Sequence, residues 1–170
     1  MRDAFKIHTF ELPSDADLND LCVAEQTVVL ALRHQGCTFT RMNLERLAHY
    51  KTKLQESGYG LCVVHMGTNN EIDGLMKDYL GDLNYKLIED PSRRYYQALG
   101  LRRASLLQAF GLKEFIYGFK AFLKGHGLGP LRGDGFQLGG VFRVYRGEVD
   151  VSSPTFRASD EFDFDSVFEG

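Results

Sequence analysis

The chain has 170 residues, of which 44% are hydrophobic and 25% are charged, as expected for a single globular domain spanning residues 1–170. Its net charge of -3 provides no basic face for nucleic acid, so nucleic-acid binding is not expected. No apolar run approaches the roughly 20 residues that span a bilayer, and the first residues lack the apolar core of a secretory signal. We therefore expect a cytoplasmic protein that does not enter a membrane.

The first half of the chain predicts strands that alternate with helices. Near the N-terminus we expect a weak edge strand and one short helical turn, at His8–Leu12 and Asp17–Leu21. Thr27–Leu32 is rich in β-branched residues and almost wholly apolar, which predicts a strand covered on both faces. The apolar spacing then becomes helical over Arg41–Ser57. Leu61–Met66 predicts a second buried strand, and Asn69 or Asn70 caps the helix that follows it.

The second half predicts a shorter strand, two further helices and a hairpin. Tyr85–Ile88 is the expected strand, and Asp90-Pro91 predicts a capping carboxylate before a proline at the first helical position. Ala104–Lys124 has helical spacing. Arg146-Gly147 predicts a tight turn between two strands. After Pro154 we expect a last short helix, capped by Asp163 or Asp165.

The order of these elements indicates the fold class. Strand and helix alternate three times, which requires parallel strands joined by right-handed crossovers. An antiparallel hairpin and a terminal helix follow. This order predicts an α/β thioredoxin-like sandwich with a central mixed sheet and helices on both faces. A flavodoxin-like doubly wound sheet fits the periodicity as well, and the late hairpin favours the sandwich.

Cys37 is the main candidate for a functional residue. It lies between the first buried strand and the following helix, where unpaired N–H groups and the helix dipole favour a negative charge. Arg33, His34 and Arg41 add positive potential, and the hydroxyl of Thr40 is placed to donate a hydrogen bond to the sulfur. This pattern predicts a thiolate that is open to oxidation by a peroxide or a disulfide. The alternative is a cysteine that simply packs at the start of a helix.

The remaining cysteines and histidines suggest weaker sites. Cys62 lies near the start of its strand, whereas Cys37 follows the end of the neighbouring one, so we expect Cys62 to be a core residue out of disulfide range. A loop could carry Cys22 toward Cys37 as a resolving thiol. His34 and His65 could gather with Cys37 at one sheet edge, but no further ligand completes a zinc site, so we expect no metal.

Two other stretches invite functional interpretation. The glycine-rich residues 125–135 do not form a phosphate-binding loop directly after a strand, so we expect no dinucleotide cofactor. The tripeptide Arg132-Gly133-Asp134 matches a cell-adhesion motif, which chance explains better in a cytoplasmic chain. The aromatic residues between Phe110 and Phe122 predict a core helix face, with a hydrophobic crevice or a dimer surface as alternatives.

Several segments together resemble one family. They are, in chain order, LRHQGCTFTRMNLERL, GTNN, EDPSRRYYQALGL and QLGGVFRVYRGEV. The chain from about Phe10 onward is similar to the peroxiredoxin-like 2 branch of the alkyl hydroperoxide reductase/thiol-specific antioxidant superfamily. The resemblance implies a thioredoxin-like fold and a thiol-dependent redox activity, in some members the reduction of peroxides or lipid endoperoxides. It maps Cys37 onto the catalytic cysteine.

The chain departs from the family pattern at three places. Thr40 replaces the second cysteine of the typical GCxFC centre. Leu30 and His34 stand where peroxiredoxins carry a proline and a threonine or serine. Gly139-Gly140 occupies the segment that brings an arginine to the cysteine in peroxiredoxins. These departures imply a centre with a single sulfur.

Two hypotheses of function follow. The leading one is a thiol-dependent oxidoreductase of the one-cysteine type, in which the Cys37 thiolate reduces a peroxide or a disulfide. An external thiol, either a small one such as glutathione or that of a redox partner protein, then restores it. The alternative is a non-catalytic thioredoxin-like domain that binds a protein partner or a hydrophobic ligand. A homodimer is compatible with both hypotheses.

Overall fold

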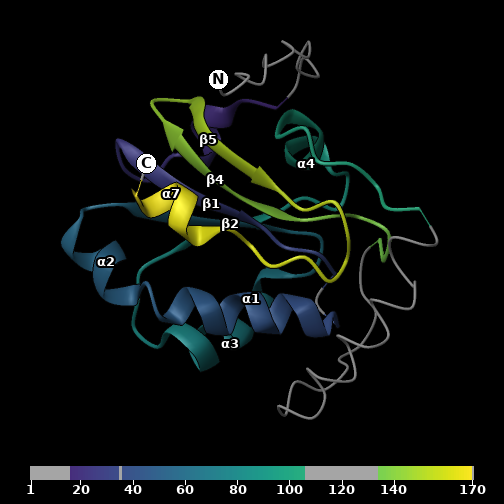
Figure 1. Cartoon of the computed structure of the whole chain (residues 1–170), viewed down its shortest axis with the longest axis horizontal. Helices are drawn as coiled ribbons and strands as arrows, with labels where there is room; N and C mark the ends of the chain where they lie inside the picture. Colours follow the sequence, from purple (N-terminus) through teal and green to yellow (C-terminus); the bar gives the residue numbers. More distant parts are fainter. Residues whose placement is uncertain (1–15, 35, 106–133, 170) are drawn as a thin grey trace, which may run out of the picture.

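The computed structural model describes residues 16–34, 36–105 and 134–169, which form a mixed sheet covered by helices (Figure 1). The strands are β1 (Gln26–Ala31), β2 (Gly60–His65), β3 (Lys86–Glu89), β4 (Gly140–Tyr145) and β5 (Glu148–Pro154). The helices are η1 (Leu18–Leu21, a 3-10 helix), α1 (Thr38–Ala48), α2 (Lys51–Glu56), α3 (Asn69–Leu80), α4 (Arg94–Ala98) and α7 (Phe164–Glu169).

The strands lie in the order β3-β2-β1-β4-β5. β1, β2 and β3 are parallel, as the alternation of strands and helices predicts. β4 pairs antiparallel with β1, and β5 returns antiparallel beside β4. The predicted hairpin is therefore present, with Arg146 and Gly147 at positive φ in its turn. This mixed sheet confirms the predicted fold class and not the doubly wound alternative.

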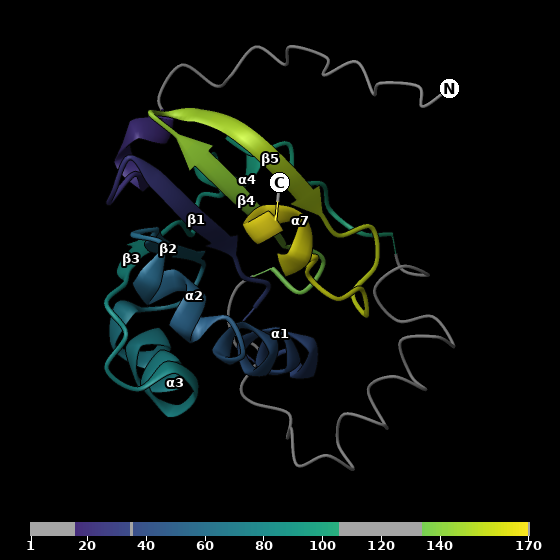
Figure 2. The same ribbon diagram turned by 60° about the vertical axis from the view of Figure 1, so that its left-hand side comes forward.

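Side chains of β1 alternate between two apolar layers. Val28 and Leu30 belong to the core that α1 and α3 cover, together with residues of α7. Val29 and Ala31 belong to the core on the opposite face, under α4 and η1. Figures 1 and 2 show α1 and α3 on one side of the sheet and α4 on the other. Both faces of β1 are therefore excluded from solvent, which explains its continuous apolar sequence.

The predicted helix over Arg41–Ser57 is two helices. α1 begins earlier, directly after Cys37, and the chain bends at His49 and Tyr50 before α2 starts. The bend directs Tyr50 toward the C-terminal helix, where its ring stacks on Phe168 with centroids 5.0 Å apart. Periodicity within one segment could not reveal this break, because the stacking partner lies more than a hundred residues away.

The ends of the other helices differ in detail from the predictions. α3 has Thr68 as its N-terminal cap, so Asn69 already belongs to the helix. Asp90 does act as a cap, since its carboxylate accepts hydrogen bonds from the N–H groups of Arg94 and Tyr95. The helix nevertheless begins at Arg94, because Arg93 before it has a left-handed φ of 65°.

Some predictions lie outside the described residues. These are the edge strand at His8–Leu12, the tripeptide residues Arg132 and Gly133, and the aromatic residues between Phe110 and Phe122. Of the helix predicted over Ala104–Lys124, only the first two residues are described, and they are not helical. None of the helices in the described ranges has the length and apolar character needed to cross a membrane.

Candidate functional site

Cys37 lies where β1 passes into α1. It is the N-terminal cap residue of α1, and its own N–H donates to the carbonyl of His34 at 3.0 Å. Its carbonyl accepts the N–H of Thr40 at 3.0 Å, which closes the first helical turn. The unpaired N–H groups and the positive end of the dipole of this eleven-residue helix therefore lie at the cysteine. This is the placement that the sequence predicts.

The guanidinium of Arg33 contacts the sulfur directly. Its Nη1 atom donates to the Sγ atom of Cys37 at 3.0 Å. Three backbone carbonyls hold the same guanidinium: Nε donates to Gln137 at 3.1 Å, Nη2 donates to Gly135 at 2.8 Å, and Nη1 also reaches Ala158 at 3.5 Å. Because a guanidinium can only donate, the sulfur acts as the acceptor, and a thiolate accepts more strongly than a thiol.

Gly139 allows the chain before β4 to pass close to the end of β1, near the side chain of Arg33. A Cβ atom on Gly139 would lie 2.4 Å from the carbonyl oxygen of Ala31 and 3.4 Å from the Cγ atom of Arg33. The segment before β4 is where the peroxiredoxin pattern supplies an arginine to the cysteine. In this chain the guanidinium at the sulfur comes instead from the residues that follow β1.

The sulfur is buried, although the sequence predicts a thiolate that is open to oxidation. Cys37 is only 5% exposed and packs with Phe39, Met42 and Ala158. Ala158 belongs to the connection between β5 and α7, which closes over the start of α1. The sequence could not reveal this cover, because it comes from the far end of the chain.

His34 carries no positive charge at neutral pH, so its expected electrostatic support of Cys37 is wrong. Burial, together with the neighbouring charge of Arg33, lowers the pKa of its imidazole to about 4, while Asp134 acts in the opposite direction. Its Nδ1 atom is buried and makes no hydrogen bond in the described part of the chain. His34 contributes its backbone carbonyl to the turn before α1.

The hydroxyl of Thr40 has a different partner from the expected one. It donates to the carbonyl of His34 at 3.4 Å, and the side chain is 2% exposed. The predicted hydrogen bond from this hydroxyl to the sulfur of Cys37 is therefore not the one that the residue makes. Thr40 stabilises the turn that carries the cysteine.

The guanidinium of Arg41 is also not directed to the sulfur. Within the described ranges it makes no hydrogen bond to Cys37, and its buried Nε atom has no partner. Its charge acts on Tyr79 at the end of α3: burial raises the pKa of the tyrosine hydroxyl, and Arg41 opposes that rise. Of the three basic residues predicted around Cys37, the structure brings the side-chain charge of Arg33 alone into contact with the sulfur.

The other two cysteines lie on the opposite face of the sheet. Cys62 is fully buried, and burial raises the pKa of its thiol to about 12, which confirms its predicted place in the core. Cys22 packs against the same apolar cluster. It precedes β1 whereas Cys37 follows it, so six strand residues, on the order of 20 Å, separate the two ends. The idea that Cys22 reaches Cys37 within one chain is therefore wrong.

His65 ends β2 and is fully buried. Its Nε2 atom lies 2.9 Å from the Oδ1 atom of Asn69, and burial lowers the pKa of its ring. Within residues 16–34, 36–105 and 134–169, no three His, Cys, Asp or Glu side chains gather in a way that could hold a metal ion.

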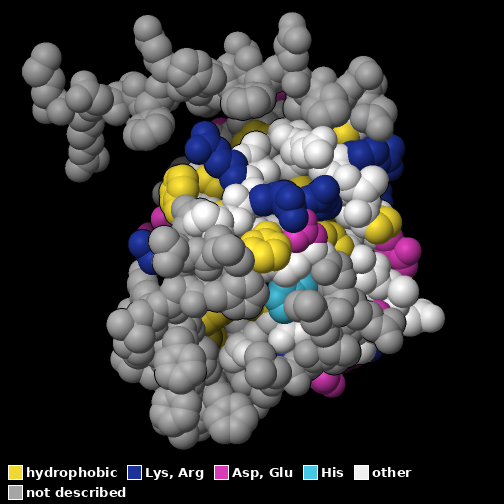
Figure 3. Space-filling model, turned by 90° about the vertical axis from the view of Figure 1, so that its right-hand side faces the viewer, with side chains coloured by type: hydrophobic (Ala, Val, Ile, Leu, Met, Phe, Trp, Pro, Cys, Tyr) yellow, Lys and Arg dark blue, Asp and Glu magenta, His cyan; other side chains and the backbone are white. Residues whose placement is uncertain are grey.

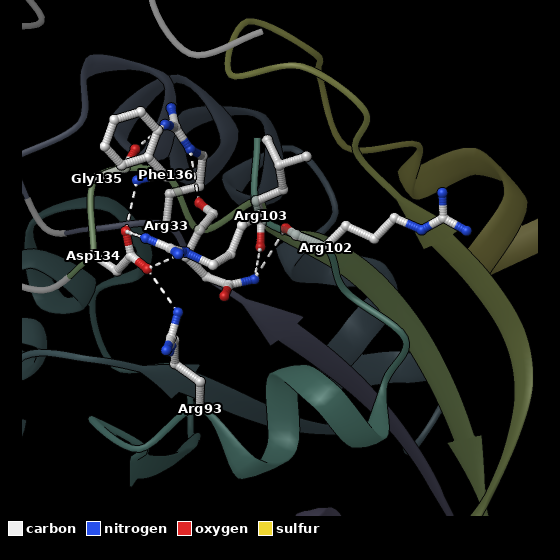
Figure 4. Close-up of polar contacts among 9 residues, drawn as sticks. Arg33, Arg93, Arg102, Arg103, Asp134, Gly135 and Phe136 are labelled. Carbon is white, nitrogen blue, oxygen red and sulfur yellow. Dashed lines mark hydrogen bonds and ion pairs between the residues drawn. The ribbon is translucent and has the colours of Figure 1, made fainter. Parts of the chain in front are cut away.

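Sequence reasoning missed the segment Asp134–Leu138, which supplies two of the carbonyls at Arg33. Asp134 itself binds two arginines, Arg93 and Arg103 (Figure 4). The Asp-Gly pair at its start is a local signal for a turn. No local signal identifies the arginines that this segment binds. Arg33 lies about a hundred residues earlier in the chain, and Arg93 and Arg103 lie several tens of residues earlier.

Comparison with known families and proteins gives consistent matches. Residues 46–165 match the family described as AhpC/TSA antioxidant enzyme. Peroxiredoxin-like 2A of Bos taurus is 33% identical over 128 residues, covering 73% of this chain and 55% of the bovine protein. Peroxiredoxin-like 2A of Xenopus tropicalis is 28% identical over 143 residues, covering 82% of this chain and 59% of the frog protein. The chain thus spans little more than half the length of these curated relatives.

A solved structure gives a similar result for the fold. A cysteine-to-serine mutant of the peroxiredoxin 6 of Arenicola marina superposes with a TM-score of 0.53 and 16% identity, covering 84% of this chain and 58% of that chain. This likeness supports the thioredoxin-like fold alone. The family match begins nine residues after Cys37, so the assignment of a role to this cysteine depends on the local geometry.

Proposed function

Because the chain belongs to the AhpC/TSA antioxidant enzyme family, in its peroxiredoxin-like 2 branch, we propose that it is a thiol-dependent oxidoreductase of the one-cysteine type. Cys37 is the reacting residue, and its thiolate reduces a peroxide. An external thiol, glutathione or that of a redox partner protein, restores it. Arg33 is the supporting residue.

The contact between Arg33 and Cys37 is the observation that carries this proposal. The guanidinium lies 3.0 Å from the sulfur and is itself fixed by backbone carbonyls of two other segments. With Arg33 only 6% exposed, water competes little for this interaction. A buried, immobile cation beside the sulfur of a residue at a helix start favours the thiolate, which is the form that attacks.

The reaction balances with two external thiols. The thiolate attacks the terminal oxygen of the peroxide ROOH, a sulfur–oxygen bond forms, the oxygen–oxygen bond breaks, and the leaving alkoxide takes a proton from water to become ROH. Cys37 is then a sulfenic acid. The first external thiol attacks its sulfur, releases water and forms a mixed disulfide. The second thiol attacks that disulfide, which returns the Cys37 thiol and releases the oxidised donor.

The need for an external thiol follows from the positions of the other candidates. Thr40 carries a hydroxyl where the family pattern has its second cysteine. Cys22 and Cys62 lie on the far face of the sheet. The burial of Cys37 favours small reactants, hydrogen peroxide over a protein disulfide as the oxidant and glutathione over a partner protein as the external thiol, because a sulfur that is 5% exposed is reached more easily by a small molecule.

Intact mass after treatment with hydrogen peroxide, with dimedone to trap sulfenic acid, tests the proposal. The wild-type protein should form one dimedone adduct at Cys37, and glutathione should replace the adduct by a mixed disulfide. Cys37→Ser should form neither. Arg33→Met should oxidise about ten- to a hundredfold more slowly, because a charge-assisted hydrogen bond contributes about 1.5–3 kcal/mol. Arg33→Lys keeps the positive charge but loses the planar guanidinium with its several N–H donors. Its oxidation rate should lie between those of the wild type and Arg33→Met.

Arg102→Met is the matched control. It removes an arginine whose side chain is exposed and points away from the other labelled arginines (Figure 4). This variant should oxidise at the wild-type rate. Oxidation of Arg33→Met at the wild-type rate would reject the role of Arg33, and absence of any adduct in the wild-type protein would reject the proposal as a whole.

The burial of Cys37 supports a second candidate function, a non-catalytic domain that binds a partner protein or hydrophobic ligand. A sulfur that is 5% exposed among Phe39, Met42 and Ala158 is what a purely structural cysteine looks like. In this case Cys37→Ser should retain the biological activity of the protein. The mass experiment separates the two functions, since a structural cysteine forms no adduct.

A further inference from the structure

The segment Asp134–Leu138 forms one wall of the space that holds Arg33. Two of its carbonyls, those of Gly135 and Gln137, accept hydrogen bonds from the guanidinium at 2.8 Å and 3.1 Å. The direction in which Arg33 presents its Nη1 atom to Cys37 therefore depends on where this segment lies. The apolar side chains of the segment anchor its C-terminal end, because Leu138 is buried with Ala104 while Phe136 is only half-buried.

The carboxylate of Asp134 fixes the segment to the body of the domain. Its Oδ2 atom lies 2.7 Å from Nη1 of Arg93 and 2.7 Å from Nε of Arg103. Figure 4 shows these two side chains reaching Asp134 from different directions, Arg93 from the start of α4 and Arg103 from the chain that follows α4. The side chain of Asp134 is 17% exposed, so solvent screens these ion pairs only in part.

The same residue also shapes the turn. The Oδ1 atom of Asp134 accepts the N–H of Phe136 at 2.9 Å, and its carbonyl accepts the N–H of Gln137 at 3.0 Å. Burial acts to raise the pKa of the Asp134 carboxyl, but the hydrogen bond from Phe136 and the charges of Arg103 and Arg93 leave it below its usual value. The carboxylate is therefore charged throughout the neutral range.

Two arginines, Arg93 and Arg103, contact this carboxylate. Figure 3 shows one face of the molecule, on which lysine and arginine side chains lie beside acidic ones and a histidine. Asp134 pairs with Arg93 and Arg103, whereas Arg33 is the residue that donates to the sulfur of Cys37.

We propose that Asp134 is a positioning residue that acts on Cys37 through Arg33. Its two ion pairs and its turn hold the carbonyls of Gly135 and Gln137 where they orient the guanidinium toward the sulfur. This inference rests on the proposed function, since it assigns to Asp134 a part in the reaction of Cys37. It adds a residue that neither the motif around the cysteine nor the family resemblance identifies.

The sign of one effect distinguishes positioning from direct electrostatics. A carboxylate near a thiolate disfavours the thiolate, so loss of the negative charge alone would make Cys37 more reactive. Loss of a positioning carboxylate lets Arg33 move away from the sulfur and makes Cys37 less reactive. The two explanations predict opposite changes for the same substitution.

The experiment measures the rate at which iodoacetamide alkylates Cys37 as a function of pH. It uses the Cys22→Ser variant, so that the thiol of Cys22 does not contribute to the measured alkylation. Asp134→Ala should slow alkylation at neutral pH about three- to tenfold and move the rise of the profile to higher pH, a smaller effect than that of Arg33→Met. In the Arg33→Met background, Asp134→Ala should leave the alkylation rate of Cys37 unchanged, since the residue through which Asp134 acts is absent.

Asp150→Ala is the matched control. It removes another carboxylate paired with an arginine, 2.6 Å from Arg143, on the hairpin strands β4 and β5. It should lower the thermal unfolding temperature without changing the alkylation profile. If Asp134→Ala does not fold, Asp134→Asn keeps the size and one acceptor and should shift the profile in the same direction by less.

Three outcomes would overturn the inference: faster alkylation, an unchanged profile, or equal slowing with and without Arg33. The failure of this inference and that of the proposed function remain distinguishable. An effect of Arg33→Met without an effect of Asp134→Ala rejects the positioning role alone. The absence of an effect of Arg33→Met rejects both the role of Arg33 and the route by which Asp134 would act.

Discussion

At the scale of single residues, burial decides the charge of His34. Its pKa is about 4 in the folded protein, against an ordinary value of 6.5. Above about pH 6.5 the imidazole is neutral in both states. Between about pH 6.5 and pH 4 the unfolded chain takes up a proton that the folded protein does not, so the free energy of unfolding decreases as the pH falls. Burial of His65 contributes in the same direction.

The substitution His34→Gln tests this explanation. It removes one of the two groups, so its free energy of unfolding should fall less between pH 7 and pH 5 than that of the wild type. Urea unfolding at the two pH values measures the difference. His49→Gln, at an exposed position after α1, should leave the wild-type pH dependence intact. An equal loss of stability in His34→Gln and the wild type would contradict the neutral state of His34.

At the scale of elements, the connection between β5 and α7 is fastened to α1 by one buried amide. The Oδ1 atom of Asn43 accepts the N–H of Phe162 at 2.8 Å, and Asn43 is 5% exposed. Phe162 and Phe164 follow in the core between the sheet and α1. The same connection carries Ala158 over the sulfur of Cys37, so its attachment also determines how closed the candidate site is.

Removal of this amide should loosen the connection. Asn43→Ala leaves the N–H of Phe162 buried without an acceptor, which costs about 1–3 kcal/mol, while the higher helix propensity of alanine returns up to about 0.7 kcal/mol. The urea unfolding midpoint should therefore decrease, and Cys37 should become more accessible to iodoacetamide. Asn70→Ala, at an exposed position of α3, should do neither. A wild-type midpoint in Asn43→Ala would show that water replaces the amide without cost.

At the scale of the whole molecule, the sheet separates the three thiols. Cys37 lies beyond the last residue of β1 and on the side of α1, whereas Cys22 and Cys62 belong to the cluster under α4. Peptide mapping of peroxide-treated protein without reduction should therefore find no link between Cys37 and either of them within one chain. A cross-linked peptide in the monomeric fraction would contradict this arrangement.

A variant with a second thiol near Cys37 provides a positive control for this prediction. Thr40→Cys places a second thiol one helical turn from Cys37, at the position where the family pattern carries one. Peroxide should then produce an intrachain disulfide between positions 37 and 40, and dimedone labelling should decrease. The same mapping thus has a positive control that differs from the wild type by one side chain.

The local pattern of the chain determined the strands of its sheet and the place of its cysteine. Apolar runs bounded by turns identified β1 and β2, the Arg146-Gly147 pair identified the hairpin, and the strand-to-helix transition placed Cys37 at a helix start. Each of these features depends on residues that are neighbours in the sequence, so periodicity and turn chemistry are sufficient.

The tertiary structure alone decided the chemistry around that cysteine. It brought Arg33 into contact with the sulfur, left His34 uncharged and turned the hydroxyl of Thr40 to a carbonyl. It also supplied the carbonyls of Gly135 and Gln137 and the ion pairs of Asp134. Charge state and hydrogen-bond direction depend on burial and on partners about a hundred residues away, and neither is encoded in a local stretch of sequence.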